Sequence, residues 1–228
     1  MKLLIISLLF AACYAVPMDL SGKMFVFPEK SATARVQLLP TGNNFTSVTV
    51  CFRYITDLTR HYSLFSMATS TNSNAFLIFK TSIAGRFDFW THDQNTLFDG
   101  IPSEQNTWYS MCGTWDGNSR LVQYWTNGSP STKKAGFQGN IDGKPFIVLG
   151  QEQDSFGGKF DAGQSFVGMI TDVHMYNYVL SPCEIQAFTN DLNFTPGNVI
   201  NWRALEFIST GTVVLDNSQM NGCYRGQS

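Results

Sequence analysis

Charged residues are scarce in this chain, and neither sign dominates. Lysine and arginine number 15, and aspartate and glutamate number 17, so the formal net charge is −2. Proteins that bind nucleic acid or anionic membrane surfaces gather lysine and arginine on one face. A chain with so little positive charge is not expected to bind either of them.

Long apolar runs are absent after the first residues. Lys2 is followed by an apolar stretch from Leu3 to Ala12 and by small residues near an expected cleavage point, a pattern typical of a secretory signal peptide. A membrane anchor needs about 20 apolar residues, and this run is shorter and stops before Pro17. We therefore predict a signal peptide over residues 1–15, a single domain over residues 16–228 and a secreted, extracellular protein.

Motifs of common enzymes and of zinc sites are also missing. The G-x-S-x-G and H-E-x-x-H patterns do not occur. The three histidines lie far apart in sequence, at His61, His92 and His174. Some jelly-roll glycosidases carry paired carboxylates on one strand, and the Glu-Gln-Asp of residues 152–154 begins such a pattern, but residues 155–157 offer no second catalytic carboxylate. We therefore expect neither a zinc site nor an enzyme.

Cysteines are few, and even in number once the signal peptide is removed. The four that remain are Cys51, Cys112, Cys183 and Cys223. An even number in the oxidising extracellular environment predicts two disulfides, and four cysteines allow three pairings. Cys51 and Cys112 both lie within strand-like segments, so we favour that pair and a second bond between Cys183 and Cys223. An intersubunit bond is the alternative for Cys223.

Short aromatic and β-branched segments, separated by Gly, Asn, Asp, Ser and Pro, recur along the chain. From Ser47 to Tyr54, apolar residues alternate with mixed ones, as in a half-buried strand. The pattern predicts an all-β fold, a two-sheet antiparallel jelly-roll sandwich. The other expected strands are Met24–Phe27, Tyr62–Met67, Phe76–Phe79, Arg86–Trp90, Tyr109–Trp115, Leu121–Thr126, Phe146–Leu149 and Phe166–Tyr176.

Local signals predict one helix and two tight turns. A capping box from Ser181 to Glu184, with Pro182 in the first turn, begins a helix that we expect to lie on one sheet. Its expected buried stripe consists of Ile185, Phe188 and Leu192. Asp116-Gly117 and Asn127-Gly128 tolerate positive φ angles and therefore predict tight hairpins.

The stretch from Gly150 to Gln164, GQEQDSFGGKFDAGQ, is the most informative part of the sequence. It gathers carboxylates and side-chain amides among four glycines. Calcium prefers about six to eight oxygen ligands on a loop that can wrap around the ion. Two interpretations follow, a calcium site and a plain solvated loop between strands.

The sequence resembles a known family, the pentraxins, over nearly the whole of the expected mature chain. The segments that carry the resemblance are KMFVFP at Lys23–Pro28, YSLFS at Tyr62–Ser66, LGQEQDSFGGKF at Leu149–Phe160 and NWRAL at Asn201–Leu205. The family pattern H-x-C-x-[ST]-W appears from Ser110 to Trp115, with serine in place of the histidine. Because Ser110 shares a strand face with Cys112, we expect this difference to change local packing more than function.

The resemblance implies two neighbouring calcium ions and a ligand that coordinates them. The implied calcium ligands are Asn74, Glu152, the Gln153 carbonyl, Asp154, Asp161 and Gln164. The family has an aspartate just before the asparagine, whereas this chain has Ser73, so we expect weaker calcium binding, with dissociation constants of about 10⁻⁴ to 10⁻³ M. Phe79 matches the apolar wall beside the ligand, and a plain core residue is its alternative interpretation. Asp93 is a candidate for the acid that would face a choline nitrogen.

The resemblance also implies a function, which is calcium-dependent pattern recognition in innate immunity, with acute-phase proteins among the relatives. The implied ligands are phosphocholine, phosphoethanolamine or anionic carbohydrate, bound by a homopentamer whose opposite face meets complement. A ring of weak sites gains avidity by multivalency. The alternative is a laminin-G-like adhesion module without this ligand site, because the run from Thr114 to Gly128 occurs across that wider group.

Glycosylation is expected at Asn44, in Asn-Phe-Thr before a strand. Asn127 and Asn193 also fit the acceptor pattern, but Pro130 and Pro196 follow directly after it. We therefore favour Asn44.

Overall fold

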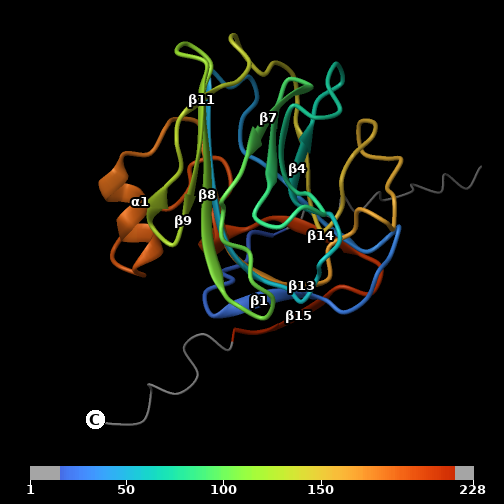
Figure 1. Ribbon diagram of the computed structural model, residues 1–228. Helices are drawn as coiled ribbons and strands as arrows, with labels where there is room; N and C mark the ends of the chain where they lie inside the picture. The colour runs from blue at the N-terminus through green and yellow to red at the C-terminus, as the bar shows by residue number, and fades with distance from the viewer. Residues whose placement is uncertain (1–15, 219–228) are drawn as a thin grey trace, which may run out of the picture.

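The computed structural model describes residues 16–218 and consists of two antiparallel β-sheets packed face to face, with one α-helix (Figure 1). The predicted calcium loop lies on the outer side of one sheet and the helix on the outer side of the other, so we call them the loop-side sheet and the helix-side sheet. This arrangement confirms the predicted two-sheet sandwich with one helix on one sheet.

The helix-side sheet has the strand order β10-β9-β8-β3-β13-β1-β15, and β11 also pairs with β9. Its strands are β1 (Lys23–Phe27), β3 (Ser47–Ile55), β8 (Tyr109–Asp116), β9 (Leu121–Thr126), β10 (Ser129–Pro130), β11 (Lys134–Ala135), β13 (Gly168–Tyr176) and β15 (Val214–Asn217). The helix α1 (Pro182–Thr189) lies beside β8 on its outer face (Figure 1).

The loop-side sheet has the strand order β14-β2-β12-β4-β5-β6-β7. Its strands are β2 (Arg35–Leu38), β4 (Tyr62–Ala68), β5 (Phe76–Lys80), β6 (Phe87–Thr91), β7 (Gln94–Phe98), β12 (Phe146–Leu149) and β14 (Phe207–Thr210). A short 3-10 helix, Trp202–Ala204, precedes β14.

The core between the sheets is rich in aromatic rings. Tyr124 of β9 contacts rings from the facing sheet, with centroid distances of 5.0 Å to Phe89, 5.0 Å to Phe98 and 5.8 Å to Phe87. The contacts to Phe98 and Phe87 are edge-on, and such contacts add to the gain from burial. The side chains between these core residues along each strand point outward, which leaves the outer face of the loop-side sheet for binding.

All the predicted strands are present, with ends shifted by a few residues. The sequence analysis missed β2, β7, β14, β15 and the two-residue strands β10 and β11. Several of these lie at sheet edges, and β15 is exposed at every position, so they carry little of the apolar alternation that marks a buried strand.

The two predicted turns differ in how they use glycine. Asn127 and Gly128 have φ angles of 48° and 77°, which confirms the tight hairpin between β9 and β10. A hairpin also follows Asp116-Gly117, between β8 and β9, but neither of these two residues has a positive φ angle. Arg120 holds the left-handed position in that turn, with φ 56°. Gly117 is required for a different reason: a Cβ there would lie 1.9 Å from the carbonyl oxygen of Gly139.

The helix begins as predicted but ends earlier. The Ser181 N–H donates to the Glu184 carboxylate at 2.7 Å, and the Glu184 N–H donates to the Ser181 hydroxyl at 3.3 Å, which completes the capping box. Ile185 and Phe188 are buried. Leu192 is not part of the buried stripe, because the helix stops at Thr189 and the Leu192 side chain is 58% exposed.

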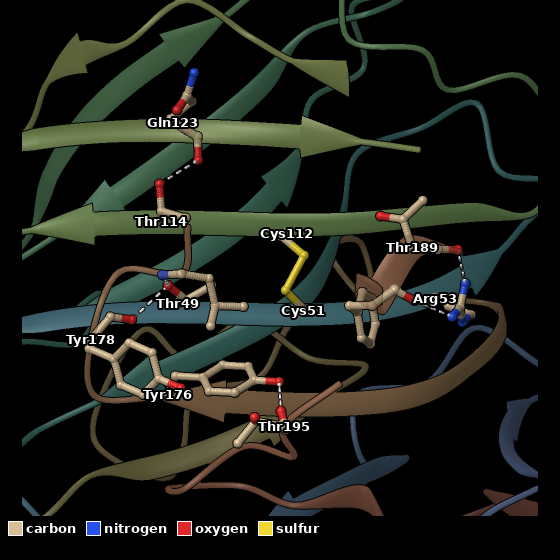
Figure 2. The surroundings of a disulfide bond; sticks show 12 residues. Thr49, Cys51, Arg53, Cys112, Thr114, Gln123, Tyr176, Tyr178, Thr189 and Thr195 are labelled. Atoms are coloured by element: carbon tan, nitrogen blue, oxygen red, sulfur yellow. Dashed lines mark hydrogen bonds between the residues drawn. A yellow bond between two sulfur atoms is a disulfide. The ribbon is translucent and has the colours of Figure 1, made fainter. Parts of the chain in front are cut away.

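The predicted disulfide between Cys51 and Cys112 is present and joins β3 to β8 (Figure 2). It packs beneath α1, where Arg53 donates to the carbonyls of Phe188 and Thr189 at the helix end, at 2.7 and 3.2 Å. Cys183 is exposed, and Cys223 lies outside the described residues, so their pairing stays a prediction. The predicted signal peptide also lies outside them.

Candidate calcium and ligand site

The loop from Gly150 to Gln164 folds back over the outer face of β12 and β4. The Gln153 side-chain amide donates to the carbonyls of Phe146 and Ser66, at 3.0 and 3.1 Å. Its side-chain oxygen accepts from the Gly157 N–H at 3.0 Å. Since both ends of the Gln153 side chain are engaged in these contacts, its main-chain carbonyl is the group that would serve an ion.

The start of the loop is fixed at Gly150 and Gln151. Gly150 has φ +85°, and a Cβ there would lie 2.2 Å from the Phe27 ring, so only glycine fits. The Gln151 amide donates to the carbonyls of Ser31 and Ala34, at 2.6 and 3.0 Å. These contacts hold the chain rigidly just before the acidic residues.

The return of the loop is held by the segment before β4. The guanidinium of Arg60 donates from Nη1 to the Gly163 carbonyl at 2.9 Å, and the Ser63 N–H donates to the Gln164 carbonyl at 3.0 Å. Burial lowers the pKa of Arg60, and the negative charge of Asp161 opposes that shift. Arg60 and Ser63 therefore hold the end of the loop between Asp161 and Gln164, a role that the sequence analysis missed.

Glu152 is the buried centre of the acidic cluster. Its residue is 4% exposed, whereas Asp154 and Asp161 are exposed. Burial raises the pKa of Glu152 to about 7, with a further increase from the nearby Asp154 carboxylate and a smaller one from Asp161. The loop thus brings Glu152, Asp154, Asp161 and Gln164 together, as the sequence analysis expected.

Within residues 16–218, two oxygens of this cluster have no hydrogen-bond partner. They are Glu152 Oε2 and Gln164 Oε1, and both atoms are buried. The Asn74 Oδ1 atom, in the loop between β4 and β5, is also buried and has no partner among the same residues. The acidic loop lies near the C-terminal end of β4, where the Asn74 loop begins. Gln153 holds it there through its contacts to Ser66 and Phe146, and Phe146 pairs with the last residue of β4.

The loop that carries Asn74 is shaped by Asp93. One carboxylate oxygen of Asp93 accepts from the Asn74 N–H and the other from the Asn72 side-chain amide, both at 2.8 Å. His92 and Asp93 form the turn between β6 and β7, with φ angles of 52° and 59°. Asp93 therefore positions the Asn74 loop, and both of its carboxylate oxygens accept hydrogen bonds there, while its role facing a choline nitrogen stays a prediction.

Phe79 lies on the outer face of β5. Its neighbour Ile78 belongs to the core between the sheets, whereas Phe79 is only partly buried and does not. Its ring stacks on that of His61, with centroids 5.9 Å apart and planes 24° from parallel. The interpretation of Phe79 as a plain core residue is therefore wrong, and His61 is a second member of this wall.

Three further predictions concern metal ligands, the histidines and glycosylation. Within residues 16–218, no three Asp, Glu, His or Cys side chains form a metal-binding group by themselves, so a calcium site here would depend on amide and carbonyl oxygens as well. His174 is buried, and burial lowers its pKa to about 3. Asn44 is exposed and its side-chain oxygen accepts from the Gly143 N–H at 2.7 Å, so its glycosylation stays a prediction.

Comparison with known proteins decides the family. The model of the Pentaxin family matches residues 23–217, which includes every strand and the whole acidic loop. The chain belongs to the pentraxin family. Serum amyloid P-component of Mesocricetus auratus is 39% identical over 86% of this pentraxin and 84% of its own length. Mucosal pentraxin of Mus musculus is 37% identical over 94% of this chain and 97% of its own length.

Solved structures agree with the fold. A heptameric SAP-like pentraxin from Limulus polyphemus superimposes with a TM-score of 0.81, at 24% identity, over 89% of this pentraxin and 98% of that chain. Domains LG4-5 of the mouse laminin α1 chain superimpose with a TM-score of 0.53, at 13% identity, over 83% of this chain and 49% of theirs. The sandwich is therefore shared with laminin modules, while the sequence places the chain among pentraxins.

Proposed function

We propose that this pentraxin is a secreted recognition protein that uses calcium to bind phosphate-bearing or anionic carbohydrate groups on surfaces, in innate immunity. The observation that carries the proposal is the set of buried oxygens of Asn74, Glu152 and Gln164, which lack hydrogen-bond partners in the described part of the chain. A buried acceptor without a partner costs about 1–3 kcal/mol. A hard cation would satisfy these oxygens together, and calcium prefers such ligands.

The donor set fits calcium well. Glu152, Asp154 and Asp161 would supply charge, the amides of Asn74 and Gln164 would supply neutral oxygens, and Gln153 would supply its main-chain carbonyl. Two ions per subunit are expected for this number of donors in the family. The Ser73 hydroxyl replaces a charged ligand, so the ion nearest Asn74 should bind more weakly.

Bound calcium would supply the positive charge that attracts a phosphate or carboxylate group of the ligand. Phe79 and His61 offer an apolar wall to the rest of the ligand, since their stacked rings lie on the same outer face as the acidic loop. We expect phosphocholine- or phosphoethanolamine-type groups to fit such a site, and no hydrolysis to follow.

We further propose a closed ring, most simply a homopentamer. The edge strands β14 and β15 carry exposed apolar side chains: Ile208, Val214 and Leu215. An exposed strand edge meeting a different surface of the next subunit makes a head-to-tail contact, which closes into a ring. Five weak sites on one face would then bind a surface with high avidity, while the helix side stays free for partners such as complement.

Two observations support the extracellular part of the proposal. Several relatives are serum proteins by name, and residues 1–15 have the composition of a signal peptide. Within residues 16–218, none of the helices has the length and apolar character needed to cross a membrane. Residues 16–228 would then form the mature protein.

Affinity chromatography tests the proposal. The purified protein is applied to immobilised phosphoethanolamine and phosphocholine in millimolar calcium and washed with a chelator. We expect retention with release by the chelator, and loss of retention for Glu152→Gln. Asp142→Asn is the matched control, because Asp142 is an exposed acid outside the loop. A folded protein that binds neither resin in calcium would contradict the proposal and favour the adhesion-module alternative.

A further inference from the structure

A cavity of about 840 Å³ lies at one end of the sandwich, where the loops that join β3 to β4, β5 to β6 and β7 to β8 meet. Its lining combines apolar side chains, hydroxyl groups and one lysine, Lys80. Neither the acidic loop nor the pair of Phe79 and His61 belongs to this lining. The cavity is therefore separate from the proposed calcium site and is not used by the proposed function.

Lys80 is the last residue of β5, and its side chain points inward. It pairs with Phe87 of β6, which belongs to the core, and directly paired residues project from the same face of a sheet. Lys80 is only 5% exposed, and its ammonium lies 5.6 Å from the centre of the Phe87 ring. Lysine is almost never buried to this extent without a partner for its charge.

Two main-chain carbonyls meet the Lys80 ammonium, but no carboxylate does. The ammonium donates to the carbonyls of Thr81 and Ile83, at 2.7 and 2.9 Å. An ammonium has three donors, and the third finds no acceptor within residues 16–218. The ion pairs in this part of the chain involve arginines and do not include Lys80. Burial lowers the pKa of Lys80, as expected for a buried ammonium without a negative partner.

Three hydroxyl groups line the same cavity. They belong to Thr59, Ser82 and Ser103, one from each of the three loops. Among the described residues, none of these hydroxyls makes a hydrogen bond, so each can donate to a ligand or accept from it. Leu58 and Ile101 add apolar surface beside them. An ammonium and several hydroxyls next to an apolar wall match the groups of a small sugar acid.

We propose that this cavity is a second binding site, which holds a small carboxylate-bearing ligand such as an acidic monosaccharide and needs no calcium. The ligand carboxylate would accept from the Lys80 ammonium, and the sugar hydroxyls would bond with those of the lining. Within the described residues, Glu104 is the one acid of the lining, and it is exposed. Its charge repels a singly charged carboxylate less than a doubly charged phosphate, so the carboxylate is the better ligand.

Titration with glucuronate and with glucose, in the presence of a chelator, separates this site from the calcium site. The two sugars differ in the carboxylate. The wild type should bind glucuronate at least about tenfold more tightly than glucose, as expected for a charge-assisted hydrogen bond. Lys80→Met keeps the apolar stem and should bring this preference close to one. Lys144→Met is the matched control, because Lys144 is exposed and lies outside the cavity, and it should keep the preference.

Equal affinity of the wild type for both sugars, or no binding of either, would overturn this second site, and that measurement needs no variant. Neither result bears on retention by phosphate resins in calcium, so the proposed function is tested independently. A preference that survives in a folded Lys80→Met protein would also overturn the proposal, because another group would then hold the carboxylate. Loss of the preference in Lys144→Met would do the same.

Discussion

Glu152 should make calcium affinity depend on pH near neutrality. Its pKa is raised to about 7 because the side chain is buried and lies near another carboxylate, and both conditions favour the protonated form. Calcium binds the deprotonated carboxylate, so protons compete with the ion. For one proton at this pKa, the apparent dissociation constant should rise about twofold at pH 7 and about elevenfold at pH 6, relative to pH 8 and above.

The same shift has a consequence for the calcium-free protein. The pKa of Glu152 in the folded state lies above its ordinary value of 4.5, so the folded state holds its proton more tightly than the unfolded state does. This contribution to stability is therefore present at low pH and lost as the pH rises from about 4.5 to about 7. Calcium should restore stability above pH 7, because it meets the charge that burial disfavours.

Isothermal titration calorimetry checks the reasoning. Titrations with calcium at pH 6, 7 and 8, in buffers of different ionisation enthalpy, should show release of about half a proton per site at pH 7. Glu152→Gln should abolish this release and weaken binding, and Asp142→Asn should change neither. An affinity that stays constant from pH 8 to pH 6 in a folded protein would refute the reasoning.

Three further predictions concern affinity and stability. Ser73→Asp should tighten calcium binding about tenfold by adding a charged ligand, with Ser73→Asn as the uncharged control, and a calcium titration without any gain would contradict this. Replacing both Cys51 and Cys112 by alanine should lower the free energy of unfolding, measured in denaturant, by about 4 kcal/mol. The reason is the chain entropy of the loop that the disulfide closes, whose ends are 61 residues apart in sequence. A loss below about 1 kcal/mol would count against this explanation. Gly117→Ala should lower the free energy of unfolding by more than about 2 kcal/mol, because the new Cβ would meet a main-chain oxygen. Gly158→Ala should lower it by less than about 1 kcal/mol, because the Cβ there meets only a serine hydroxyl at 3.4 Å. Equal effects of the two substitutions on unfolding would be inconsistent with this packing.

Local signals determined much of the fold. Alternation along Ser47–Tyr54 predicted a strand that the structure contains as β3, and the capping box at Ser181 predicted the start of α1. These signals act within a few residues, so they are readable without knowledge of the rest of the chain. The helix end was not readable, because the stop at Thr189 involves Arg53, which donates to the last carbonyls from a distant strand.

The sequence by itself also showed that carboxylates and amides gather in one loop, because their spacing along the chain is a local feature. Only the tertiary structure decided which residues from other segments surround that loop. Asp93 binds the Asn74 loop, and Phe79 projects from the outer face, because of the register of β5, β6 and β7. Register depends on core packing across whole sheets, and a shift of one residue would turn Phe79 inward, so no local pattern could have assigned these positions.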